Sequence, residues 1–208
     1  MEGRHHPWSD RLGWLPETAS QTAGPYVHIG CVPSFAGLEG MYGGEDLGTG
    51  PLCADGHEGE AIVIEGQVFD GTGAPLRDAL LEVWQADANG RFAGHDGADP
   101  RFAGWGRQPT DGETGLYRFR TVKPGQVPWP DGRMQASHVG LWIVARGINL
   151  GLYTRIYFDG DPANDEDPLL GRIEQRDRVS TLMARSDGNA WRFDVHLQGD
   201  GETVFFDV

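Results

Sequence analysis

The residues best placed to do chemistry gather in one stretch of the chain, residues 123–146. From His138 onward this stretch alternates with period two, as a strand with one buried face does. One row holds Val139, Leu141, Ile143 and Ala145, and the other holds His138, Gly140, Trp142, Val144 and Arg146. The second row carries an imidazole and a guanidinium, groups that bind metals and anions. At about 3.3 Å per residue they are roughly 26 Å apart, so they cannot serve one small-molecule site within this chain.

Composition places these residues in a strand-rich domain. The 208 residues show no break in composition, which predicts a single domain, 1–208, large enough to bury a core. With 38% apolar residues, 32 glycines and 13 prolines, turns and strands are favoured over helices. We therefore predict an all-β fold with long loops.

The chain is strongly acidic, with a formal net charge of −14. That charge argues against binding nucleic acid or an anionic membrane surface, because both require positive patches. The cationic residues are 16 arginines and the single Lys123. Arginine suits interfaces and bidentate anion recognition, but a genomic codon bias gives the same count, so composition leaves both causes open.

Three features bear on the compartment. Cys31 and Cys53 are too few for a disulfide framework and lack a CxxC spacing, which favours a reducing compartment. No apolar run reaches the roughly 18 residues that span a bilayer. The first residues carry charge and lack the apolar core of a secretory signal. We expect a cytoplasmic protein with no membrane partner.

The N-terminal segment, residues 1–30, reads as an extended arm that needs a surface to lie on. Residues 1–15 are polar and without periodicity, and they include His5, His6, Trp8 and Trp14. An arm without rigid packing lacks the geometry of a metal site, so we interpret the two histidines as solvated. Residues 16–30 are expected to be extended and to end in a short apolar strand, and the Gly-rich residues 31–59 predict no element.

From residue 61 the chain reads as strands separated by turns rich in Gly, Pro, Asn and Asp. The predicted strands are residues 62–70, 78–87, 116–122, 138–146, 153–158, 190–197 and 203–206. One short helix is expected near residues 175–184. The pattern predicts an antiparallel β-sandwich with at most one or two short helices. The acidic residues 159–167 indicate a solvated turn, with a weak site for a hard cation as the alternative.

Six segments, taken in order, resemble one known family. They are residues 15–30 (LPETASQTAGPYVHIG), 81–90 (LEVWQADANG), 117–125 (YRFRTVKPG), the strand from His138, 145–149 (ARGIN) and 201–207 (GETVFFD). Together they resemble the intradiol ring-cleaving dioxygenases. The first segment and the last two narrow the resemblance to the metal-free subunit of the family's two-subunit members. The resemblance covers most of residues 15–208. The main segments without it are residues 31–59 and 93–108.

The resemblance implies a ferric iron held by two tyrosinates and two histidines. The positions that match these four ligands are Phe92, Val127, His138 and Gly140. Phenylalanine and valine cannot donate to a metal, glycine has no side chain, and one imidazole does not hold ferric iron. We therefore interpret these residues as vestigial metal-site positions and expect this chain to bind no metal.

The resemblance also implies an iron-bearing beta subunit as obligate partner, in a heterodimer that assembles further into a symmetric oligomer. Residues 1–30 would contribute to that interface. The residues lent to the rim of the partner's iron pocket would be Thr22, Gly24, Pro25, Tyr26 and Arg146. The implied reaction cleaves protocatechuate with O2 to 3-carboxy-cis,cis-muconate, with Fe(3+) bound by the beta subunit and not by this chain. Arg146, the catalytic candidate, would stabilise an anion there.

Other interpretations stay open at this point. Arg146 could form only a surface ion pair at the end of its strand, and Tyr26 could only pack in an interface. The whole chain could be a non-catalytic binding or structural sandwich that has lost the reaction. An independent metalloenzyme using His28, His57, His95 or the acidic loop is disfavoured, because those histidines follow no ligand spacing.

Overall fold

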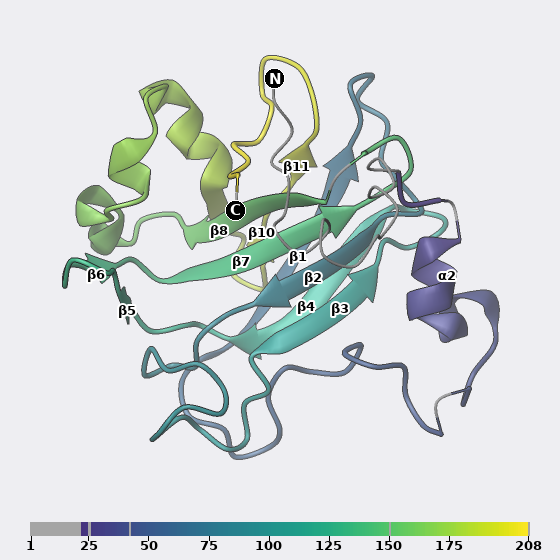
Figure 1. Ribbon diagram of the computed structural model, residues 1–208, viewed down its shortest axis with the longest axis horizontal. Helices are drawn as coiled ribbons and strands as arrows, with labels where there is room; N and C mark the ends of the chain where they lie inside the picture. The colour runs from purple at the N-terminus through teal and green to yellow at the C-terminus, as the bar shows by residue number, and fades with distance from the viewer. Residues whose placement is uncertain (1–21, 25, 42, 150, 208) are drawn as a thin grey trace, which may run out of the picture.

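The computed structural model describes residues 22–207 apart from 25, 42 and 150. Within them the fold is mostly β, with the strands gathered in one nearly closed, barrel-like sheet and few helices (Figure 1). The helical turns between residues 162 and 182 lie at one end of the sheet, and helix α2 (Val27–Cys31) lies at the other. The predicted all-β class is confirmed at this level.

Nine strands of the described chain form the main sheet, in the order β11-β1-β10-β9-β8-β7-β2-β3 with β4 paired to β1. They are β1 (Ala61–Phe69), β2 (Leu80–Trp84), β3 (Trp105–Pro109), β4 (Leu116–Val122), β7 (His138–Val144), β8 (Leu152–Phe158), β9 (Met183–Ser186), β10 (Trp191–Arg192) and β11 (Val195–His196). A separate pair joins β5 (Val127–Pro128) to β6 (Met134–Gln135). Because β7 lies between β2 and β8, the stretch that begins at His138 is held on both sides.

The strand pairing is mixed. β1 runs parallel to β10 and β11, and β8 runs parallel to β9, whereas the other pairs are antiparallel. Parallel neighbours need a crossover connection, and the helical turns between residues 162 and 182 supply the one from β8 to β9. Three pairs thus depart from the predicted antiparallel arrangement, and the division into two sandwich layers stays a prediction.

The period-two pattern of β7 is confirmed by burial. Val139, Leu141 and Ile143 are fully buried, in a core cluster that also contains Ile64 of β1 and Phe119 of β4. Each such side chain contributes about 1.5–3 kcal/mol when it leaves water. Because this burial fixes how the strand is rotated, the row that contains His138, Gly140 and Trp142 faces away from the core.

The predicted strand at residues 190–197 is interrupted in its middle. Gly66 lies so close to the carbonyl of Phe193 that an added Cβ would overlap it. Beside this contact the backbone N–H of Gln67 donates to the carboxylate of Asp194 (2.9 Å) instead of to a main-chain carbonyl. The strand therefore divides into β10 and β11, which both pair with β1.

The strand expected at the end of residues 16–30 is a helix. In α2 the N–H of Gly30 donates to the carbonyl of Tyr26 (2.9 Å), and the N–H of Val32 donates to that of His28 (2.8 Å). These bonds between residues four apart satisfy the backbone within the segment, without a neighbouring strand.

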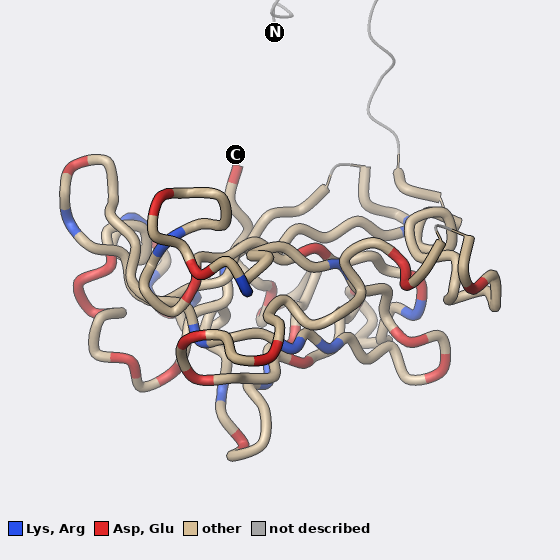
Figure 2. The backbone as a smooth tube through the Cα atoms, turned by 90° about the horizontal axis from the view of Figure 1, so that it is seen from below, with Lys and Arg blue, Asp and Glu red and all other residues tan. Residues whose placement is uncertain are grey.

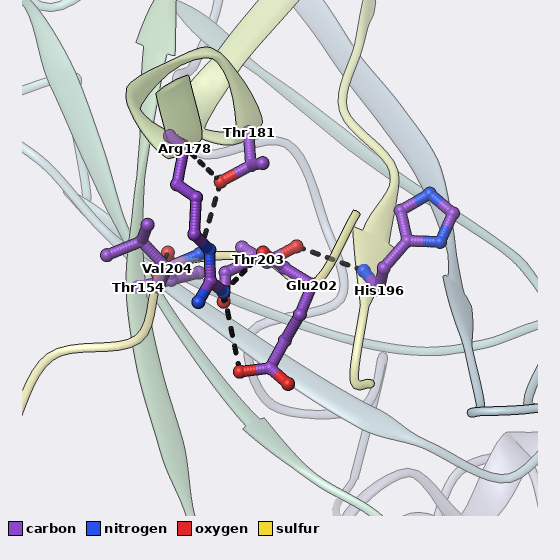
Figure 3. A network of polar contacts seen from close by, with 7 residues as sticks. All are labelled: Thr154, Arg178, Thr181, His196, Glu202, Thr203 and Val204. Carbon is purple, nitrogen blue, oxygen red and sulfur yellow. Dashed lines mark hydrogen bonds and ion pairs between the residues drawn. The ribbon is translucent and has the colours of Figure 1, made fainter. Parts of the chain in front are cut away.

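The predicted strand at residues 203–206 is also absent from the described structure, where this segment makes one isolated bridge to β8. Thr203 and Phe206 donate to main-chain carbonyls of β11 and β8, and side chains satisfy the backbone of Val204 between them (Figure 3). The carbonyl of Val204 accepts from Thr154 Oγ1 (2.7 Å), and its N–H donates to Thr181 Oγ1 (3.2 Å). Nη2 of Arg178 donates to the carbonyl of Glu202, just before this segment (2.6 Å). The C-terminal segment is thus anchored to the sheet without joining it.

The remaining helical turns are of the 3-10 type. They are η1 (Pro33–Ala36), η2 (Pro162–Glu166), η3 (Leu170–Arg172) and η4 (Arg176–Leu182). The helix expected at residues 175–184 is present as η4, and the chain continues directly into β9. Within the described residues, no helix combines the length and apolar character needed to cross a membrane.

The acidic residues 159–167 are less solvated than a simple turn. Asp167 is buried, and its carboxylate accepts hydrogen bonds from the N–H groups of Ala136 (2.8 Å) and Leu170 (2.9 Å). Elsewhere Asp and Glu are spread over loops on several sides of the molecule, with Lys and Arg among them (Figure 2). The charge of −14 is therefore distributed, as on an ordinary solvated surface.

Candidate functional site

The four vestigial metal-site positions line one cavity. Phe92 lies on the loop after β2, Val127 belongs to β5, and His138 and Gly140 lie on the outward row of β7. The cavity has a volume of about 580 Å³. Residues far apart in the sequence are thus brought to one place, as the motifs predict, although their vestigial role stays a prediction.

The groups around this cavity do not fit a ferric ion. Of the four positions, His138 alone has a side chain that can bind a metal. Position 140 has little room for a side chain, because a Cβ there would lie 2.8 Å from the hydroxyl of Tyr153. Tyr153 therefore takes the space that a second histidine would need. Across the described residues, no three His, Cys, Asp or Glu side chains gather as a metal site.

His138 is held as a neutral imidazole. Its Nδ1 donates to the carbonyl of Ala136 (2.8 Å), which sets the tautomer and leaves Nε2 as an acceptor. Burial, followed by the positive charge of Arg155, lowers the pKa of His138 from the usual 6.5 to about 4. The ring therefore carries no charge at neutral pH.

Arg155 is a cavity residue that reasoning from the sequence missed. It stands directly opposite Gly140 in the pair of β7 with β8. Its Nη1 donates to Gln135 Oε1 (2.7 Å), and its Nε is buried without a hydrogen-bond partner. No carboxylate of the described chain lies within 4 Å of its guanidinium. The available signal was the alternation Tyr153, Arg155, Tyr157 on one face of the strand.

Tyr157, next along that strand face, does not supply a tyrosinate. Burial raises the pKa of its phenol well above the usual range. Its hydroxyl donates to the carboxylate of Asp167 (3.3 Å), which favours the protonated form. The resemblance implies tyrosinates as donors to iron, so Tyr157 offers no substitute for the two positions that Phe92 and Val127 occupy.

Two of the predicted rim residues, Thr22 and Arg146, meet at the turn that follows β7. The hydroxyl of Thr22 accepts from the N–H of Gly147 (2.8 Å) and donates to the carbonyl of Ala145 (3.2 Å), so it holds the backbone on both sides of Arg146. Thr22 and Trp142 line a second cavity, of about 410 Å³. The two cavities meet β7 at different ends, in agreement with the separation estimated from the sequence.

Arg146 itself lies in a surface ion pair. Its Nη2 is 2.9 Å from a carboxylate oxygen of Asp78, and its side chain is 65% exposed. Tyr26 is 76% exposed at the start of α2, and Gly24 precedes it without regular structure. The structure thus brings Thr22 beside Arg146 and leaves Tyr26 facing solvent. Pro25, His5, His6, Trp8 and Trp14 lie outside the described residues.

The other histidines singled out from the sequence lie in separate places. His28 is buried edge-on against Phe35, with ring centroids 4.4 Å apart, and burial lowers its pKa. His57 contacts the carbonyl of Glu58 (3.2 Å). His95 lies on the loop that borders the first cavity. They form no common site in the described part of the chain.

Comparison with known proteins extends these observations. The dioxygenase family model matches residues 45–199. The protocatechuate 3,4-dioxygenase alpha chain of Pseudomonas putida is 46% identical over 198 residues, which cover 93% of this chain and 97% of that protein. The protocatechuate 3,4-dioxygenase beta chain of Burkholderia cepacia is 38% identical over 184 residues, covering 78% of each.

The fold of this chain is also similar to that of a solved structure. The dioxygenase domain of a dioxygenase carbohydrate-binding protein fusion from Streptomyces sp. SirexAA-E superposes with a TM-score of 0.54 at 28% identity, over 74% of this chain and 87% of that one. The segment matched by the family model contains every strand of the described sheet. Similarity of this extent in sequence and in fold means that the chain belongs to the intradiol ring-cleaving dioxygenases.

Proposed function

We propose that this chain is the metal-free alpha subunit of a heteromeric intradiol dioxygenase that cleaves protocatechuate with O2 to 3-carboxy-cis,cis-muconate. The observation that carries the proposal is the cavity in which His138 alone, of four ligand positions, can donate to a metal. The family is iron-dependent, so Fe(3+) would be bound by a beta subunit. Relatives named alpha chain, and the related beta chain, support this division of labour.

The role assigned to this chain is positioning and electrostatics at the rim of the partner's iron pocket. Arg146 is the catalytic candidate, because its guanidinium is largely exposed and its ion pair is of the weak surface kind, so it can turn toward an anion. Thr22 supports the backbone around it, and Tyr26 projects from the same segment. Gly24 and Pro25 complete the rim by resemblance.

We also propose that residues 1–208 form one domain, built as a two-layered β-sandwich whose first 30 residues contribute to the subunit interface. One core cluster joins residues of β1 and β4 to residues of β2 and β7, as facing layers would. Residues 22–31 pack on the outward face of the sheet, where Val27 meets Leu80 and Val144. The pair of subunits would assemble further into a symmetric oligomer.

Co-expression with an iron-bearing beta chain tests the proposed function. We expect the two chains to purify together, to contain one ferric ion per pair, and to consume O2 with protocatechuate. This chain expressed alone is the control, and we expect it to contain no iron because it lacks the ligands. Metal analysis and an oxygen electrode measure both results.

Two outcomes would count against this function. A chain that purifies as a lone homomer, ignoring the beta chain, would favour the alternative of a non-catalytic binding or structural sandwich. A tightly bound ferric ion with ring-cleaving activity in the isolated chain would overturn the division of labour itself.

The variant Arg146→Ala tests the proposed role of Arg146 at the rim of the partner's iron pocket. In the assembled enzyme we expect kcat/KM to fall on the order of 100-fold, because a charge-assisted contact to an anionic group is lost. Iron content should stay unchanged. Arg118→Ala is the matched control, since Arg118, on β4, is likewise exposed (59%) and paired with a carboxylate, that of Glu65. Parallel loss of iron and activity in Arg146→Ala would contradict the positioning role.

A further inference from the structure

The cavity beside His138 contains a cation that its surroundings leave uncompensated. Arg155 is ionised at all physiological pH values, and its Nε is buried without a partner. Burying an ionised group costs free energy unless a counter-charge or hydrogen bonds offset the loss of water. Nη1 donates to Gln135 Oε1 (2.7 Å) and, at 3.4 Å, to the hydroxyl of Tyr157, but both partners are neutral. The site therefore favours an anion.

The nearby carboxylates do not fill this need. Asp167 accepts hydrogen bonds from the N–H groups of Ala136, Leu169 and Leu170, and no ion pair joins it to Arg155. Asp96 also borders the cavity, but on an exposed loop. Two guanidinium groups border the cavity: that of Arg91, on the same exposed loop, donates to the carbonyl of Asp96 (2.8 Å), whereas that of Arg155 lies on β8 with a buried Nε that has no partner. Arg155 is therefore the buried fixed positive charge of this cavity.

The walls of the cavity indicate the shape of the anion. Aromatic rings of Trp84 and Phe92 border it, and the apolar Val127 and Pro128 add to the same lining. A volume of about 580 Å³ lies within the range of small-molecule pockets.

We propose that this cavity binds a small aromatic carboxylate, with Arg155 holding the carboxylate and Trp84 and Phe92 contacting the ring. The site lies on this chain alone, and it is separate from the rim residues Thr22 and Arg146. It adds a ligand site to the subunit and does not depend on the function proposed above.

Isothermal titration calorimetry tests the proposal on the full-length protein, in whichever assembly it purifies. Benzoate is the probe, and benzamide is its uncharged analogue of the same shape. We expect benzoate to bind, and benzamide to bind on the order of tenfold more weakly because it lacks the charge. Arg155→Gln should raise the Kd of benzoate by a similar factor. Arg118→Gln, which removes a strand arginine far from the cavity lining, should leave the Kd unchanged.

A second variant keeps the test decisive if Arg155→Gln does not fold. Trp84 is 59% exposed, so Trp84→Ala leaves the core intact, and it should also weaken benzoate binding. Benzoate bound elsewhere, for instance at a partner's iron, would be insensitive to both variants. The proposal is overturned if benzoate does not bind, if benzamide binds equally well, or if neither cavity variant changes the Kd.

Discussion

At position 140 this chain offers neither a metal ligand nor a charge, and the neighbouring strand supplies a positive charge to the cavity. Glycine there removes a side chain that could bind metal, and the hydroxyl of Tyr153 lies in the space that is freed. Arg155 stands opposite on the neighbouring strand and gives the cavity a fixed positive charge. That charge, together with burial, keeps His138 neutral, so the remaining imidazole is an acceptor and not a cation.

The depressed pKa of His138 predicts a pH dependence of folding stability. Its pKa is about 4 in the folded chain and near 6.5 when unfolded, so above pH 6.5 neither state is protonated and this residue adds no slope. Between pH 6.5 and 4 the unfolded state binds the proton and the folded state does not, so stability falls by about 1.4 kcal/mol per pH unit.

Chemical denaturation across this range, with His138→Gln as the comparison, isolates the contribution. Carboxylates affect both proteins equally, so the wild type should lose stability more steeply than the variant below pH 6.5. Equal slopes in the two proteins would show that His138 is not held neutral.

Among the elements, the segment around helix α2 contacts the end of β7 that precedes Arg146. Its helix α2 lies where a strand was expected, and Val27 packs against Leu80 and Val144 on the outward face of the sheet. Thr22 adds two hydrogen bonds to the turn after β7. The position of Arg146 is therefore set by an element more than one hundred residues away in the sequence.

The variant Thr22→Val should remove the two hydrogen bonds between Thr22 and the turn after β7. Loss of the two hydrogen bonds removes a support of the backbone around Arg146, and we expect a stability loss of about 1 kcal/mol or less because the site is partly exposed. In the assembled enzyme kcat/KM should fall with iron content unchanged. Thr22→Ser keeps the hydroxyl and should retain activity. Full activity in Thr22→Val together with loss of activity in Thr22→Ser would indicate that the methyl group matters, and not the hydrogen bonds.

Over the whole molecule, β7 separates two regions of one sheet face. The cavity with His138 and Arg155 lies at one end, and Thr22 with Arg146 lies at the other. Two large aromatic side chains, Trp84 and Trp142, are exposed on this face, which is typical of surfaces that meet a partner. Under the proposed function Arg146 serves a pocket of the partner subunit, so the co-expression test applies to the assembly and not to the isolated chain.

Much of this protein followed from residue types and local patterns. The alternation along β7 predicted its buried row because successive side chains on a strand face opposite sides. That Phe92, Val127 and Gly140 cannot donate a side chain to a metal was evident from the sequence, since this depends on residue type alone. Motifs in order identified the family that the comparisons confirm.

Tertiary structure decided what depends on contacts between distant residues. The division of β10 from β11 arises where Gly66 meets Phe193, and the parallel pairs arise from crossovers that no local pattern specifies. Arg155 became a cavity cation only because strand register sets it opposite Gly140 and leaves its Nε without a partner. Sequence alone determines which groups a chain can offer, whereas packing decides which of them are buried, paired or left free to bind, because desolvation and hydrogen bonding are properties of the folded surroundings.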